Sequence, residues 1–247
     1  MALIFADLSF RYGRKTEVFS NFSTQIEGAS TVLLGPNGAG KSTLMAVAAS
    51  HLKPSKGTVS WNGVEATTRR DRARYRRAVA WIPQQITPFP GLTVREQVAY
   101  AGWLKGLSRA EAWQASDGAI RSLRLEKLAN RKSHQVSGGQ LRRMGIAGAL
   151  THQSEIILMD EPTAGLDPRQ RAVFRELVAE LSQSVKVVIS THQTEDLADL
   201  YQEVVVLDAG VVQFQGSSQE FHALAESATS PRESAEMAYA KLVDREA

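Results

Sequence analysis

A glycine-rich segment near residue 40 carries the strongest chemical signal in the sequence. Gly35-Pro36-Asn37-Gly38-Ala39-Gly40-Lys41-Ser42 matches the pattern G-x-x-x-x-G-K-[ST] in full, and it lies between the apolar stretch 31–34 and an expected helix over 42–50. The N–H groups of such a loop form a concave anion site, to which the N-terminus of the helix adds positive potential. Lys41 would neutralise phosphate oxygens and Ser42 would ligate Mg²⁺. The alternative is a glycine-rich turn that binds nothing.

Two adjacent carboxylates end a second apolar stretch. Asp160 and Glu161 follow the residues 156–159 directly. Ligands of open α/β sheets bind at the carboxyl ends of the strands, so Asp160 is expected near the glycine-rich loop and in the Mg²⁺ shell. Glu161 would then face an attacking water, which fits the metal-assisted hydrolysis of a phosphoanhydride. The alternative is an ordinary charged strand end.

A third motif has the features of another anion site. Ser137-Gly138-Gly139-Gln140 precedes the helical stretch 141–150, and its first and last residues have the spacing of a capping box. Its two glycines permit a close approach of the backbone to a ligand. A chain with one nucleotide does not need a second such site, whereas a two-fold dimer could close it over the partner's nucleotide. On spacing alone, a plain helix cap is the simpler interpretation.

His192 follows a third apolar stretch, which ends at Ile189. A histidine at the carboxyl end of a strand beside a phosphate site could contact the γ-phosphate or the attacking water. A lone histidine is more often an ordinary polar residue with its hydrogen bonds satisfied. Both interpretations stay open at this point.

The elements that position these residues follow from the apolar pattern. The short stretches 31–34, 156–159 and 185–189 are typical of buried parallel strands, and another strand is expected over 78–82. The first thirty residues alternate loosely, which indicates antiparallel strands with one solvated face. Because helical patterns separate the apolar stretches, the expected class is α/β with a mostly parallel sheet and flanking helices.

The region from 91 to 150 has a different character. Thr93 with Glu96, and Ser108 with Glu111, have capping-box spacing at the start of helical patterns, and the region contains no strand pattern. The sequence therefore predicts a helical subdomain over 91–150, inserted into a core formed by 1–90 and 151–225. The remaining residues, 226–247, are expected to form a short helical tail.

The composition is that of an ordinary globular protein. The 247 residues include 29 Lys and Arg, 26 Asp and Glu, and no Cys. The lack of cysteine excludes disulfides, thiolate metal sites and a Cys nucleophile. No apolar stretch approaches ~18 residues, so no membrane span is expected. The first residues lack the pattern of a signal peptide, so we expect a cytosolic protein.

The densest run of charge covers residues 69–77. It contains six arginines and a single acid, Asp71. Such a run could bind nucleic acid or anionic lipid headgroups, but a solvated helix face before the strand 78–82 is the favoured interpretation. Because the net charge of the chain is only +3, no nucleic-acid partner is expected.

Together these motifs resemble those of the nucleotide-binding ATPase subunits of ABC transporters. Gly35–Ser42 is similar to the Walker A motif of that family, Ile156–Glu161 to Walker B with its catalytic glutamate, and Ser137–Gln140 to the ABC signature. The remaining matches are Ala164–Asp167 for the D-loop, Gln84 for the Q-loop, His192 for the switch histidine and Tyr12 for the aromatic residue that stacks on adenine. The motifs occur in the order of the family, over about residues 3 to 216. Val136 stands where the family usually has Leu.

The resemblance implies a fold, a mechanism and partners. The fold would be a P-loop NTPase core with an N-terminal antiparallel β subdomain and the helical insertion. Two ATP molecules with Mg²⁺ would be bound in a head-to-tail dimer, each between the Walker A motif of one chain and the signature of the other. The partners would be a membrane permease and a second copy or a paralogous ATPase, at the cytoplasmic face of the cell membrane.

The resemblance also assigns roles to individual residues. Glu161, His192 and Gln84 would be catalytic, and Ser42, Gln84 and Asp160 would hold the metal. The residues expected to contact ATP are Tyr12, Gly35, Pro36, Asn37, Gly38, Ala39, Gly40, Lys41, Ser42, Thr43, Ser137, Gly138, Gly139, Gln140 and Asp167.

Three further segments indicate a branch of the family. Residues 102–112, Arg142-Arg143 and 165–170 are similar to those of stand-alone ATPases that work with small exporter-type membrane subunits. We therefore expect an exporter subunit. An importer ATPase shares every catalytic motif and is the alternative, and a soluble ABC ATPase acting on nucleic acid or ribosomes is a more distant one. The loop Phe89–Leu92 is a candidate contact with the permease or, equally, part of the core.

Overall fold

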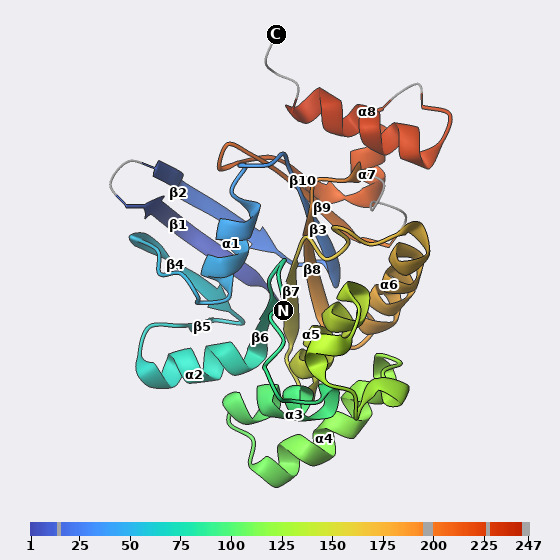
Figure 1. The fold of residues 1–247 in the computed structure, drawn as a ribbon. Helices are drawn as coiled ribbons and strands as arrows, with labels where there is room; N and C mark the ends of the chain where they lie inside the picture. Colours follow the sequence, from blue (N-terminus) through green and yellow to red (C-terminus); the bar gives the residue numbers. More distant parts are fainter. Residues whose placement is uncertain (14–15, 195–199, 226–227, 244–247) are drawn as a thin grey trace.

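A six-stranded sheet forms the centre of the computed structural model, which describes residues 1–13, 16–194, 200–225 and 228–243 (Figure 1). Its strand order is β10-β9-β3-β8-β7-β6, and all neighbours are parallel except the β9–β10 pair. The bounds are β3 Ser30–Leu34, β6 Val79–Ile82, β7 Ile156–Asp160, β8 Lys186–Thr191, β9 Glu203–Asp208 and β10 Val211–Ser217. The expected α/β class with a mostly parallel sheet is confirmed.

The second sheet is antiparallel and has the order β2-β1-β4-β5. Its strands are β1 Leu3–Tyr12, β2 Thr16–Ile26, β4 Lys56–Trp61 and β5 Val64–Glu65. Apolar residues at alternate positions of β1 and β2, including Phe5 and Phe19, pack with Leu44 and Met45 of the helix that follows β3. The antiparallel strands expected in the first thirty residues are confirmed, and β4 and β5 extend this sheet.

Eight α-helices and two short 3₁₀ helices are described. The bounds are α1 Lys41–Ala48, α2 Arg69–Ala78, α3 Val94–Leu104, α4 Arg109–Ser122, α5 Gly138–Thr151, α6 Pro168–Leu181, α7 Ser218–Ala223, α8 Pro231–Val243, η1 Glu126–Leu128 and η2 Ser133–Gln135. The three capping boxes expected at Thr93, Ser108 and Ser137 are all formed. Among the described helices, none is long and apolar enough to cross a membrane.

The region 91–150 contains helices and one isolated bridge, between Thr93 and Lys132, but no strand. Helices α3, α4 and α5 pack on one another. Apolar residues of these helices, such as Val98 and Met144, share one core with Ile157 and Ile189 of the sheet. The domain boundaries at 90 and 150 therefore stay a sequence-based prediction. The expected helical tail is represented by α8, while residues 226–227 and 244–247 lie outside the described part.

Several elements differ from the sequence-based expectation. The stretch 204–207 was not expected to be a strand, yet it forms most of β9 and turns into β10 through Ala209 and Gly210, both with positive φ. Two consecutive residues with positive φ are the mark of a tight hairpin turn, which this dipeptide permits. Strand β8 also continues to Thr191, two residues beyond the expected end, because Leu34 of β3 pairs with Thr191.

Candidate functional site

The glycine-rich loop joins the carboxyl end of β3 to the first turn of α1. Gly40 caps this helix with φ of 104°, and a Cβ atom there would lie 2.9 Å from the ring of Phe19. A Cβ atom on Gly35 would lie 2.1 Å from the carbonyl oxygen of Leu207. The N–H of Gly210 in the β9–β10 turn donates to the Ala39 carbonyl at 3.0 Å. Only glycine therefore fits at positions 35 and 40. The β9–β10 hairpin, which the sequence analysis did not expect, holds the loop in place through its backbone.

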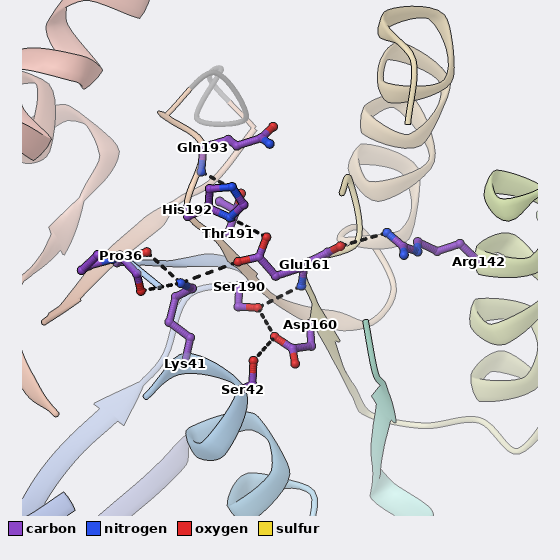
Figure 2. A network of polar contacts seen from close by, with 11 residues as sticks. Pro36, Lys41, Ser42, Arg142, Asp160, Glu161, Ser190, Thr191, His192 and Gln193 are labelled. Carbon is purple, nitrogen blue, oxygen red and sulfur yellow. Dashed lines mark hydrogen bonds and ion pairs between the residues drawn. The ribbon is translucent and has the colours of Figure 1, made fainter. Parts of the chain in front are cut away.

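Lys41 lies buried under this loop. Its Nζ donates to the carbonyl oxygens of Gly35 at 2.7 Å and Pro36 at 3.0 Å, and it forms an ion pair of 3.6 Å with Oε1 of Glu161 (Figure 2). Burial lowers the pKa of the Lys41 ammonium, while Glu161 opposes that shift. A buried ammonium that is held by backbone oxygens and one carboxylate can exchange these acceptors for the oxygens of a bound phosphate.

Ser42 and Asp160 meet at the carboxyl edge of the sheet, as expected. The hydroxyl of Ser42 donates to Oδ1 of Asp160 at 3.0 Å, and the hydroxyl of Ser190 donates to the same oxygen at 2.6 Å. Asp160 and Ser190 are paired across β7 and β8, which explains their contact. A hydroxyl and a carboxylate oxygen at this distance are hard ligands of the kind that Mg²⁺ prefers.

Glu161 and His192 form a second contact at the same edge. Nδ1 of His192 lies 2.7 Å from Oε2 of Glu161, so this carboxylate faces both His192 and Lys41. The backbone N–H of Glu161 donates to the hydroxyl of Ser190 at 3.0 Å. Glu161 has φ of 47°, a conformation that side-chain-bearing residues adopt at a cost and that is common at functional sites.

The motif Ser137–Gln140 lies elsewhere on the molecule. It caps α5, and with Leu166 and Asp167 it lines a depression of about 490 Å³. Asp167 caps α6 by accepting from the N–H of Gln170 at 2.8 Å. In the described part of the chain, no hydrogen bond or ion pair joins Ser137–Gln140 to the glycine-rich loop. Among the described residues, the depression beside Ser137 also contains none of the glycine-rich loop.

The remaining expected residues take different positions. Tyr12 is half exposed, and its hydroxyl lies 3.3 Å from Oγ1 of Thr43, on the first turn of α1. Thr43 itself is buried. Gln84 follows β6 with its side chain exposed, and only its backbone carbonyl has a hydrogen-bond partner in the described part of the molecule.

Comparison with known proteins decides the family, because residues 19–164 match the family model described as ABC transporter. The chain belongs to the ABC transporter family. It is similar to two proteins of Bacillus subtilis, the uncharacterised ABC transporter ATP-binding protein YxlF (31% identity) and the linearmycin resistance ATP-binding protein LnrL (32%). The matches cover 84% and 81% of this chain and 68% and 64% of those proteins. It therefore spans about two thirds of their length.

Other relatives and solved structures extend this picture. A probable sulfate/thiosulfate import ATP-binding protein CysA of Chlorella vulgaris is 32% identical over 89% of this chain and 93% of its own length. The cbiO1 subunit of Clostridium perfringens, part of the ABC transporter complex cbiONQ, has a TM-score of 0.78 and 28% identity, with 90% of both chains covered. A dimeric, post-hydrolysis ATP-binding cassette with ADP and Pi has a TM-score of 0.76 and 26% identity, covering 87% of this chain and 98% of that one.

These relationships identify the chain as an ATP-binding subunit of the family and as an ATPase. The geometry fits a nucleotide with its metal. The loop leaves open space beyond Gly38, Lys41 lies beneath it, and the Ser42–Asp160 pair offers oxygen ligands at its edge. The loop is thus suited in its shape and charge to the phosphates of ATP, and the donor set is chemically suited to Mg²⁺.

Two residues of the ABC ATPase site were missed by the sequence analysis. Ser190 joins both acids, because its hydroxyl contacts Oδ1 of Asp160 and the N–H of Glu161. Arg142 on α5 is buried, and its guanidinium donates to the carbonyl oxygen of Glu161 at 2.9 Å (Figure 2). It also donates to the carbonyl oxygen of Gln84 at 2.9 Å. The sequence analysis noted the doublet Arg142-Arg143 only for its family resemblance. Hydrophobic periodicity counts every arginine as a polar residue, so it could not predict that Arg142 is buried.

Proposed function

We propose that this ABC ATPase energises substrate transport, in the export direction, by a separate membrane permease. The observation that supports the ATP-driven part of the proposal is the cluster at the carboxyl edge of the sheet. There a phosphate-binding lysine, an oxygen pair for Mg²⁺ and a carboxylate–histidine pair converge within hydrogen-bond or ion-pair distance. This cluster has the groups that phosphoanhydride hydrolysis requires.

The roles follow from the contacts. The loop N–H groups and Lys41 bind the β- and γ-phosphates of ATP, with Tyr12 against the adenine. Ser42 and Asp160, with Gln84 as the third expected ligand, would hold Mg²⁺, which would supply positive charge against the phosphate oxygens. Glu161 would accept the proton of the attacking water. His192 would hold the Glu161 carboxylate in position through its 2.7 Å contact, and it is a candidate contact of the γ-phosphate.

A head-to-tail dimer completes the site in this proposal. Within the described residues, the N–H groups of Gly138 and Gly139 at the start of α5 have no hydrogen-bond partner, and the depression bordered by the motif Ser137–Gln140 contains none of the glycine-rich loop. A second copy, or a paralogous ATPase, would place this motif and Asp167 over the γ-phosphate. The post-hydrolysis cassette to which this chain is similar is a dimer, which supports the arrangement.

A mixed dimer tests the sandwich. One chain carries Ser137→Arg and the other Lys41→Ala, so one composite site contains both lesions and the other contains neither. The proposal expects one active site per mixed dimer, with ATP hydrolysis near half of the wild-type rate unless the two sites act in strict alternation. Two active sites per mixed dimer, counted by trapping of labelled nucleotide, would contradict it.

The permease and the direction of transport need a separate experiment. The similarity to LnrL supports an exporter, whereas the similarity to CysA favours the second candidate, an importer ATPase. In both cases the chain would lie at the cytoplasmic face of the membrane, bound to the permease. Affinity purification from detergent-solubilised membranes, followed by identification of the bound permease and by transport assays in inside-out vesicles, decides between them. ATP-dependent uptake into such vesicles means export.

A further inference from the structure

A basic helix and several exposed apolar side chains lie together at one end of the molecule. Figure 1 shows α2, α3 and α4 at this end, opposite α8. All six arginines of α2 are exposed, and its only buried residue is Tyr75, whose hydroxyl donates to the Ala48 carbonyl at 2.5 Å. The helix is therefore anchored by one aromatic side chain, and the rest of its surface carries positive charge.

The arginines of α2 have little neutralisation within the chain. In the described ranges, none of them forms a salt bridge. The single acid of the helix, Asp71, is engaged at its N-terminus, where it accepts from the hydroxyl of Thr68 at 2.5 Å. Arg72 and Arg76 donate to backbone carbonyls, of Thr67 and Ser50. The remaining guanidinium groups are available to a ligand with several negative charges.

Apolar side chains border the C-terminal end of this helix. Nζ of Lys105 donates to the carbonyl oxygen of Arg76, which ties the end of α3 to the end of α2. The two residues before Lys105 are Trp103, 45% exposed and stacked on Tyr100, and Leu104, 58% exposed. Large apolar side chains that remain this exposed beside a basic helix mark an interaction surface.

We propose that this surface, formed by the arginines of α2 with Trp103 and Leu104, binds the anionic headgroups of a lipid membrane. Guanidinium groups bind phosphates in a bidentate manner. Tryptophan side chains such as Trp103 favour the membrane interface, and an aliphatic side chain such as Leu104 gains free energy by entering the acyl region. Leu104 has no ring that could stack on a nucleic-acid base, so the surface fits a membrane better than a nucleic acid. The inference rests on the proposed function, which brings the chain to a membrane. The contact would orient the ATPase there in addition to the permease.

Vesicle binding in the absence of a permease tests the surface. The purified chain is centrifuged with vesicles of phosphatidylglycerol and phosphatidylcholine, or of phosphatidylcholine alone. We expect binding to the anionic vesicles only, with a partition coefficient that falls as salt increases. Arg70→Glu with Arg74→Glu reverses two exposed arginines one turn apart, and it is expected to lower the partition coefficient on the order of tenfold or more. Leu104→Ser is expected to lower it several-fold.

A matched control separates this surface from net charge. Arg232→Glu with Lys241→Glu makes the same change of charge on α8, at the opposite end of the molecule, and should leave vesicle binding near the wild-type level. ATP hydrolysis without lipid should be unchanged in the two double variants and in Leu104→Ser. A failure of the proposed function would appear in this assay, and a failure of the membrane inference would appear only in the vesicle assay. Equal losses in both double variants, no binding to anionic vesicles, or arginine-dependent binding to nucleic acid but not to vesicles would overturn the inference.

Discussion

The guanidinium of Arg142 donates a hydrogen bond of 2.9 Å to the backbone carbonyl of Glu161, and a second one of 2.9 Å to that of Gln84. Arg142 belongs to α5, the helix that begins with the motif Ser137–Gln140. One buried side chain therefore connects that helix to the residue after β7 and to the loop after β6. If the N-terminus of α5 binds the partner's nucleotide, Arg142 is the side chain that joins this helix to Glu161 of the same chain.

Arg142→Met, which keeps an unbranched apolar stem but removes the hydrogen-bond donors, is expected to lower kcat about tenfold to hundredfold, because Glu161 loses its positioning. The Kd for ATP of the single chain should change little, since Arg142 makes no hydrogen bond to the glycine-rich loop among the described residues. Arg142→Lys should restore part of kcat through one hydrogen bond. Steady-state kinetics and nucleotide titration measure both quantities.

Arg95→Met is the matched control. The guanidinium of Arg95 also has partners within the chain, an ion pair of 2.7 Å with Asp117 and the ring of Trp113 at 4.1 Å, and both belong to α4. It should lower stability without lowering kcat in the folded protein. The same loss of kcat in both variants would mean that Arg142 acts through stability alone.

Glu161→Gln removes the base but keeps the size of the side chain. We expect kcat to fall roughly 10²- to 10⁴-fold while ATP still binds, because a general base contributes about that factor. ATP should then hold the variant in a dimer, which size-exclusion chromatography detects. Glu176→Gln, an exposed change on α6, should match the wild type in both assays. A kcat within a few-fold of wild type for Glu161→Gln would remove this residue from the base position.

Tyr12→Ala tests the adenine contact. Tyr12 is half exposed above the first turn of α1, where a purine can stack on it. Since stacking of a base on an aromatic ring contributes about 1–3 kcal/mol, KM for ATP should rise roughly tenfold with little change in kcat. Tyr12→Phe removes only the 3.3 Å contact with Thr43 and should keep KM near wild type. An equal rise of KM in both variants would attribute the effect to that contact instead of stacking.

His152 is expected to make stability depend on pH. Burial, aided by the nearby Lys105, lowers the pKa of this imidazole to about 4, and Nδ1 lies 3.1 Å from the Arg77 carbonyl. The unfolded chain, with the ordinary pKa of 6.5, therefore binds more protons than the native state between those values. This contribution to stability is complete above the unfolded pKa and is lost as the pH falls toward 4.

The measurement is chemical unfolding at about pH 7 and about pH 5, where the wild type should lose on the order of 2 kcal/mol through this group. His152→Gln has no titrating group at this position, so its loss over the same interval should be smaller by about that amount. Equal pH dependence in both proteins would show that His152 titrates normally in the native state.

The chemistry was readable in the sequence because it depends on residues that are close along the chain. The spacing from Gly35 to Ser42 requires only one loop and one helix turn, and the order of Asp160 and Glu161 requires only the end of one strand. The capping boxes at Thr93, Ser108 and Ser137 were equally local, and all three are present. Parallel strands then bring their carboxyl ends to one edge, which is why Ser42 and Asp160 could be expected to meet.

Contacts between residues far apart in the sequence were decided only by the tertiary structure. Ser190 joins Asp160 to Glu161 because β8 lies beside β7 in a register that no local pattern reveals. The hairpin β9–β10 packs its backbone on Gly35 and Ala39, and Arg142 reaches two loops 58 and 19 residues away. Hydrophobic periodicity reports how far each segment is buried, but it does not specify the partner, because many neighbours bury the same apolar face equally well. Only the packed chain selects one of them.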